Sequence, residues 1–211
     1  MVSLILETIL NFTLGVIGWG GYWGVFVLMA LESANIPIPS EVIMPFSGFL
    51  ALLAGPPAGG FNFWLVVLIG AFGNLAGSLF SYWLGYLIRH NVLHWNHHRV
   101  SAEVDRAQKW LDRWGDWAIF ISRLLPVVRT FISFPLGILK TKSLWKFSYL
   151  TFGGSFIWSA FLAYLGFILG ENWQVLHIYF RKFDYLIVGL AIMAGIFILY
   201  RKKGLIIPIY K

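Results

Sequence analysis

The chain has 211 residues, of which 59% are hydrophobic and 12% are charged, and its mean hydropathy is +0.75. Ordinary soluble domains carry roughly a quarter of their residues as charged side chains, so this composition excludes them and predicts an integral membrane protein. The sequence has no cysteine, which excludes disulfides and thiolate chemistry. The net charge of +7 gathers in basic runs beside apolar segments, a pattern typical of contact with anionic lipid and not with nucleic acid.

The N-terminal quarter of the chain contains an apolar segment and a broken helix. Residues 1–18 either cross the membrane or lie along its surface, and both remain open. Residues 20–54 are largely apolar, but Pro37 and Pro39 break the helix, because proline lacks a backbone N–H and clashes with the preceding turn. Each arm has about 13 residues and reaches about 20 Å, less than the hydrocarbon core of about 30 Å. We therefore expect a re-entrant hairpin over 20–54.

The middle of the chain contains one long apolar run and one charged segment. Residues 61–88 are long enough to cross a bilayer with some tilt. Residues 89–116 contain five Lys or Arg and four Asp or Glu, and the stretch EVDRAQKWLDRW within them is typical of an amphipathic surface helix. We expect 89–116 to be a cytoplasmic loop that connects two halves of the protein.

The second half repeats the order of the first. Residues 117–139 are apolar but interrupted at Pro126, and then by Pro135 and Gly137, which predicts a second re-entrant hairpin. Spanning helices are expected at 144–170 and 183–200. With 89–116 in the cytoplasm, two later basic clusters fall on the same side, as the positive-inside tendency requires, and one falls opposite. The first two are Lys140 to Lys146 and Arg201 to Lys203, and the third is Arg181 with Lys182.

Two segments of the chain resemble each other. GNLAGSLFSYWLGYLI (73–88) and GSFIWSAFLAYLGFIL (154–169) align without gaps. Each follows a broken hairpin, and in the topology above the two run in opposite directions. This pattern is typical of an inverted repeat, which in transporters places the substrate site near the midplane, where two broken elements meet. We therefore predict one all-α polytopic membrane domain over 1–211, with two oppositely oriented re-entrant hairpins.

Small residues in these segments are spaced three or four apart, so that another backbone can approach closely. The glycines that we expect to serve helix packing are Gly73, Gly77, Gly85, Gly154 and Gly166.

Four charged residues flank the two breaks. On continuous helices Glu32 and Glu41 would lie about 180° apart, and Arg123 and Arg129 about 240° apart, so a chain reversal is needed for each pair to face one place. Charges at membrane depth cost at least about 2.5–3.5 kcal/mol each and usually mark a pathway, a proton site or a bound charge. The structural alternative is a set of buried ion pairs that only fix the hairpin tips.

The chemistry of the two residue types differs. A buried carboxyl without a full partner exchanges protons near neutral pH, whereas arginine stays charged and its planar fork suits a phosphate. We predict that Glu32 and Glu41 couple protons and that Arg123 and Arg129 bind a lipid phosphate, with Pro37, Pro39 and Pro126 as the hairpin breaks.

An ordered set of residues over about 30–170 carries a resemblance to a known family. The set is Glu32, Pro37, Pro39, Glu41, Gly73, Gly77, Tyr82, Gly85, Arg123, Pro126, Arg129, Gly137, Phe147, Gly153 and Trp158. It resembles the DedA family, also called the VTT or SNARE-associated membrane protein family. Members look like lipid transporters or scramblases with two opposed re-entrant hairpins, and some bacterial ones recycle undecaprenyl phosphate across the cytoplasmic membrane, driven by the proton motive force.

The resemblance implies a multi-pass flippase of the cytoplasmic membrane that moves a phosphate-bearing lipid, with undecaprenyl phosphate as the first candidate. It also implies that the family's important acidic positions are Glu32 and Glu41 and its important arginines Arg123 and Arg129. The chain departs from many relatives at Lys140-Thr141-Lys142, where they have a methionine.

Other functions remain open. A phosphatidylethanolamine scramblase and a proton-coupled antiporter for small cations are the first alternatives, and a packing protein without a substrate is another. Arginines at membrane depth favour an anionic substrate over a cation. A homo-oligomer is also left open.

We expect neither an enzyme nor a cofactor or metal. His94, His97 and His98 have helical spacing but lack the glutamate of a metalloprotease motif, and Ser40, Ser47 and Ser122 have no histidine close in sequence.

Overall fold

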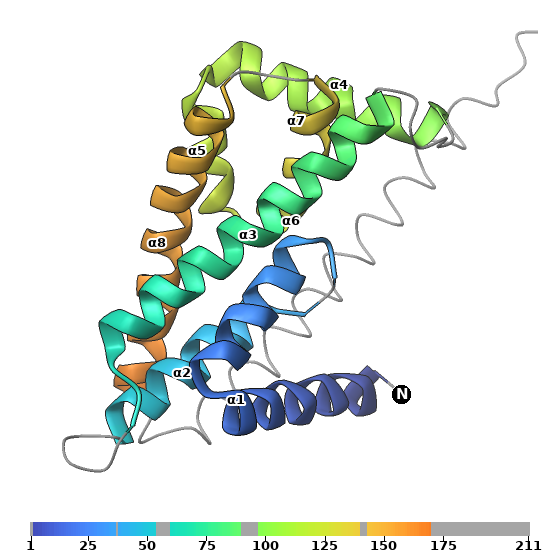
Figure 1. Cartoon of the computed structure of the whole chain (residues 1–211). Helices are drawn as coiled ribbons and strands as arrows, with labels where there is room; N and C mark the ends of the chain where they lie inside the picture. Colours follow the sequence, from blue (N-terminus) through green and yellow to red (C-terminus); the bar gives the residue numbers. More distant parts are fainter. Residues whose placement is uncertain (1, 37, 54–59, 90–96, 140–142, 170–211) are drawn as a thin grey trace, which may run out of the picture. The chain divides into compact units, whose positions relative to one another are not determined.

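The structure is a computed structural model that describes residues 2–36, 38–53, 60–89, 97–139 and 143–169. Within these ranges the regular structure consists of eight helices, α1 to α8, without a strand (Figure 1). Three helical stretches are long and apolar enough to cross a membrane, namely Asn11–Ser33, Phe63–Arg89 and Leu144–Ile168. The predicted all-α class is confirmed. The predicted span at 183–200 and the basic residues from Arg181 to Lys203 lie outside the described residues.

The N-terminal helix is longer than expected and contains a break. α1 (Val2–Ser33) is interrupted at Gly21, whose φ of 55° and ψ of −133° are accessible to glycine without steric cost. The expected boundary between the first segment and the hairpin is therefore a break inside one helix. α2 (Ser40–Leu53) begins directly after Pro39, whose carbonyl accepts hydrogen bonds from the Val42 and Ile43 amides. Pro37 lies outside the described residues.

Two long helices form the centre of the described fold. α3 (Phe63–Arg89) and α8 (Leu144–Leu169) coincide within two residues at each end with the helices predicted at 61–88 and 144–170. Neither contains a proline, so nothing interrupts their backbone hydrogen bonds. They pack against each other; α3 also packs on α1, and α8 on α2.

Three short helices follow the charged segment. They are α5 (Trp117–Arg123), α6 (Pro126–Phe131) and α7 (Ser133–Leu139). Pro126 is the first residue of α6 and separates it from α5, where the sequence predicts a break. Pro135 and Gly137, in contrast, do not interrupt the chain and lie inside α7. Pro135 is tolerated because it falls in the first turn, where backbone N–H groups have no intrahelical partner.

The charged segment itself folds as α4 (His97–Trp114), which includes the amphipathic helix predicted over 103–114. Ala107 and Leu111 are buried, whereas Asp105, Arg106 and Asp112 are exposed, so α4 has one apolar face. That face packs against the short helices, since α4 contacts α5 and α7.

Glycines lie where one helix backbone meets another. A Cβ atom added to any of the five predicted packing glycines would collide with a backbone carbonyl of a neighbouring helix. Gly77, for example, faces the Ala30 carbonyl of α1. Other contacts recur in the two halves, and their residues in α3 and α8 are paired by the alignment of 73–88 with 154–169. Gly73 faces the Phe26 carbonyl, as Gly154 faces that of Phe120, and Gly85 faces the Phe134 carbonyl, as Gly166 faces that of Pro45. Gly137 faces the Tyr82 carbonyl, as Gly48 faces that of Ala163.

Two apolar cores are separated by polar side chains along α3 and α8. One core includes Val66 and Val67 of α3 and Leu162 and Ala163 of α8. The other includes Tyr82 at the opposite end of α3 and Phe147 and Leu150 at the opposite end of α8. The buried polar residues between them on the two helices are Asn74, Ser78, Ser81, Thr151, Ser155 and Ser159. The fold therefore brings its polar interior to the middle of the two long helices.

Candidate functional site

The centre of the site is an ion pair between the two chain breaks. Nη2 of Arg129 in α6 donates a hydrogen bond to Oε1 of Glu32 in α1 over 2.6 Å, and the two side chains are only 2% and 5% exposed. The same nitrogen also donates to Oγ of Ser40, the first residue of α2. Ser33 donates from its hydroxyl to the other Glu32 oxygen at 3.2 Å. The end of α1, the start of α2 and α6 therefore meet at one guanidinium group.

Arg123 is buried beside this pair but is bound differently. Its Nη1 donates to Ser78 Oγ at 3.0 Å and to the Arg129 carbonyl oxygen at 2.9 Å, and its Nη2 donates to Ser133 Oγ at 2.8 Å and Thr151 Oγ1 at 3.2 Å. All four acceptors are uncharged. Among the described residues Arg123 forms no ion pair with a carboxylate, so its positive charge is stabilised by hydrogen bonds to uncharged oxygens.

Glu41 lies near the pair without joining it. It is in the first turn of α2, partly buried, and within the described part of the chain it makes neither a hydrogen bond nor an ion pair. Its charge repels that of Glu32. The two glutamates that the sequence treats alike therefore differ, because Glu32 is paired with Arg129 and Ser33, whereas Glu41 has no side-chain partner among the described residues.

Three buried hydrogen-bond donors at the site have no acceptor among the described residues. They are Nε of Arg123, Nε of Arg129 and Nε1 of Trp158. The Trp158 ring lies 5.6 Å from Cζ of Arg129, so the indole that carries the free N–H is in contact with the arginine of the ion pair. Buried donors without partners cost about 1–3 kcal/mol each. An anion with several oxygens would satisfy them.

The structure places the predicted site residues Glu32, Arg123 and Arg129 in one buried cluster, with Glu41 beside it. Sequence reasoning missed the hydroxyl groups that hold the two arginines, which come from Ser40, Ser78, Ser133 and Thr151. It also missed the buried bond from Ser155 to Asn74, 2.6 Å long, between α8 and α3. Serine and threonine are common in membrane helices, so the sequence does not show which of them bind the arginines. The tertiary contacts identify them.

No metal site emerges from the part of the chain that the structure describes, where no three His, Asp or Glu side chains gather. His94 lies outside that part, and the side chains of His97 and His98 are not described.

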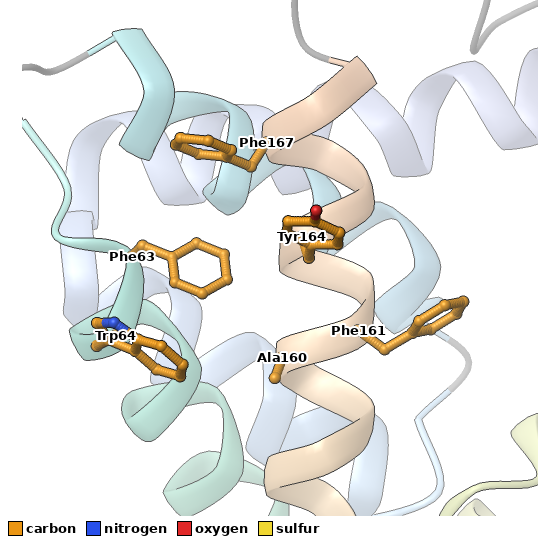
Figure 2. A pocket seen from close by; sticks show the side chains of 6 residues that line it. All are labelled: Phe63, Trp64, Ala160, Phe161, Tyr164 and Phe167. Atoms are coloured by element: carbon orange, nitrogen blue, oxygen red, sulfur yellow. The ribbon is translucent and has the colours of Figure 1, made fainter.

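A second feature is an apolar groove between α3 and α8. Figure 2 shows Phe63 and Trp64 of α3 on one side and residues of α8 on the other. Its volume is about 550 Å³, and nearly all of its lining surface is apolar. The lining residues of α8 are Ala160, Phe161, Tyr164 and Phe167. Both walls lie in stretches that are apolar enough to span a membrane. The groove suits a hydrocarbon chain.

Comparison with known proteins gives one family model and several relatives. The model, the VTT domain, matches residues 38–168. An "Alkaline phosphatase-like protein" of Lactococcus lactis subsp. cremoris is 33% identical over 85% of this chain and 84% of its own. The "Undecaprenyl phosphate transporter A" of Bacillus subtilis is 30% identical over 73% of this chain and 74% of its own, and the protein of that name from Staphylococcus aureus is 26% identical over 87% and 91%. No solved structure matches.

Proposed function

The chain belongs to the VTT domain family, the DedA family, and from this premise we propose that it is a multi-pass transporter of the cytoplasmic membrane for a phosphate-bearing lipid. Undecaprenyl phosphate is the first candidate, because two relatives carry that substrate in their names. The membership confirms the resemblance to the DedA family that the sequence carries.

One observation carries the proposal: two buried guanidinium groups face a single paired carboxylate. Arg123 and Arg129 are 1% and 2% exposed, and of the two only Arg129 has a carboxylate partner within the described residues. The buried donors without an acceptor among the described residues favour an anion with several oxygens, and arginine binds phosphate through parallel hydrogen bonds. Arg129 and Arg123 are therefore the proposed phosphate-binding residues.

The apolar groove supports a lipid as the carrier of that phosphate. It lies between α3 and α8, the same two helices that contribute Ser78 and Thr151 to the arginine cluster. We expect the groove to hold part of the hydrocarbon tail while the head group lies at the arginines.

We also propose that the two broken elements form oppositely oriented re-entrant hairpins in an inverted repeat. The recurring glycine contacts support this arrangement, since three contacts in one half each have a counterpart in the other. Ser40 lies eight residues before Gly48, and Arg129 eight residues before Gly137, so the two occupy equivalent positions and touch each other. A site at such a junction is the usual arrangement in transporters with inverted repeats.

Proton coupling is the third part of the proposal, with Glu32 and Glu41 as the proton-binding residues. Glu32 pairs with the buried Arg129, and Glu41, whose charge repels that of Glu32, has no partner in the described part of the chain. If they couple transport to protons, Glu41→Gln and Glu32→Gln should each weaken the response of transport to an imposed pH gradient. Wild-type behaviour of both variants at every pH would exclude this role.

The test of the proposed function is movement of lipid between leaflets. Protein in vesicles should move undecaprenyl phosphate, and Arg129→Ala and Arg123→Ala should abolish this movement while the protein still folds. Unchanged transport in both variants would exclude the arginines as the phosphate site. Parallel vesicles with labelled phosphatidylethanolamine, with a cation gradient and with a phosphate-release assay distinguish a scramblase, a cation antiporter and a hydrolase from the proposed transporter.

A further inference from the structure

We infer that the lipid phosphate and the Glu32 carboxylate take turns as the partner of Arg129, so that a bound phosphate leaves Glu32 protonated and the proton travels with the lipid. This inference rests on the proposed function and specifies its coupling. One phosphate would bind together with one proton, which is symport, and release of the phosphate would restore the ion pair and free the proton.

The two arginines differ in how easily a ligand can replace their partners. The two terminal nitrogens of Arg123 already bind four acceptors of the protein, and one of them is the Arg129 backbone carbonyl. Arg123 therefore holds α6 in place. Within the described part of the chain, one terminal nitrogen of Arg129, Nη2, binds a carboxylate of α1 and a hydroxyl of α2. An incoming anion can accept the same hydrogen bond from the Arg129 guanidinium as the carboxylate that it replaces.

Charge balance favours the exchange. The charged groups around Glu32 are Arg129 of α6, Arg123 of α5 and Glu41 of α2. From α3 the groups nearby are the hydroxyls of Ser78 and Ser81, which do not titrate near neutral pH. A phosphate added to two guanidinium groups and two carboxylates leaves an excess of negative charge in a buried site, which is strongly unfavourable. Protonation of Glu32 reduces that excess by one charge.

The unpartnered donors can receive the phosphate after the exchange. Nε of Arg129 and Nε1 of Trp158 belong to two side chains in contact, with 5.6 Å between the guanidinium carbon and the centroid of the indole ring, and neither nitrogen has an acceptor among the described residues. The Glu32 carboxylate has two oxygens, and one of them already accepts a hydrogen bond from Ser33. A phosphate monoester has three free oxygens, so it can accept from Arg129 and still reach further donors.

The test is equilibrium binding to the purified full-length protein in neutral detergent. Two probes are used: farnesyl phosphate, and farnesyl sulfate, whose charge does not change between pH 6 and 8. Calorimetry in buffers of different ionisation enthalpy counts the protons taken up. The wild type should bind the sulfate more tightly as the pH falls, with uptake of up to one proton. Glu32→Gln, which keeps an oxygen for Arg129, should bind at least about tenfold more tightly at pH 8 and take up none.

The control is Asp105→Asn, the same change of carboxylate to amide at an exposed position of α4, which should bind like the wild type. If Glu32→Gln binds more weakly than the wild type, or still takes up a proton, the exchange is wrong although the site stands. If Arg129→Ala binds both probes as well as the wild type does, the proposed site itself is wrong. An infrared difference spectrum of the wild type needs no variant at Glu32 and should show a protonated carboxylic acid appear when farnesyl sulfate binds.

Discussion

Glu32 and Arg129 stand 97 positions apart in the chain and form one ion pair, 2.6 Å long and almost wholly buried. The contact joins the end of α1 to α6, and Ser40 joins the start of α2 to the same guanidinium. A single side chain from the second half of the sequence thus fixes both ends of the first chain break.

The ion pair predicts an asymmetry between single and double substitutions. Arg129→Met leaves the Glu32 carboxylate buried without a partner, and Glu32→Leu leaves the guanidinium in that state, so each should lower the free energy of unfolding by about 3–5 kcal/mol. The double variant buries no unpaired charge at this pair and should regain most of that stability. Denaturant unfolding in detergent measures all three. A double variant as unstable as the two single changes combined would show that the residues are not coupled.

Arg123 should depend on its shape as well as on its charge. Arg123→Lys keeps the positive charge, but one ammonium group cannot replace two guanidinium nitrogens that serve four separate acceptors. We expect a loss of about 2–4 kcal/mol in stability, from hydrogen bonds worth about 1.5–3 kcal/mol when one partner is charged. Thr151→Val removes one acceptor and should cost less than half as much. If Arg123→Lys matches the wild type in thermal unfolding, the four hydrogen bonds do not hold the cluster.

Filling the apolar groove should impair transport of long lipids. Ala160→Trp places a large ring among Phe63, Trp64 and Tyr164, so the tail loses contact area and transport of undecaprenyl phosphate should fall about tenfold, the effect of about 1.4 kcal/mol. Ile157→Trp is the matched control, since Ile157 is half exposed on the same helix and does not line the groove. Lipid movement in vesicles measures both. Equal transport by the two variants would argue against the groove as the tail site.

The glycines in contact with backbone carbonyls should not tolerate a methyl group. Gly85→Ala and Gly166→Ala bring Cβ onto the carbonyls of Phe134 and Pro45, and we expect each to lower stability by about 1–3 kcal/mol through overpacking. Gly18→Ala is the control, because nothing lies within 4 Å of an added Cβ there. In that open position of α1, alanine should be neutral or slightly stabilising. Thermal unfolding that ranks Gly18→Ala below the other two would contradict these close contacts between glycines and backbone carbonyls.

Local patterns in the sequence were sufficient for the two long helices, α3 and α8. The apolar runs at 61–88 and 144–170 predict α3 and α8 closely, because a long uninterrupted apolar run without proline has one main solution in a membrane. The break before α6 followed from Pro126, which removes a backbone donor. Pro135 and Gly137 misled the sequence reasoning, since a proline in the first turn of a helix and a glycine against a carbonyl both belong to an intact α7.

The sequence by itself determined that this is a helical membrane protein of the DedA family and that four charged residues lie beside its chain breaks. Composition, proline positions and residue spacing are local properties, so they can be read without coordinates. The tertiary structure alone decided which charge meets which. It pairs Arg129 with Glu32, binds Arg123 to neutral oxygens and leaves Glu41 unpaired within the described residues. These partners come from different helices, and their choice depends on how close the glycine contacts let those helices approach.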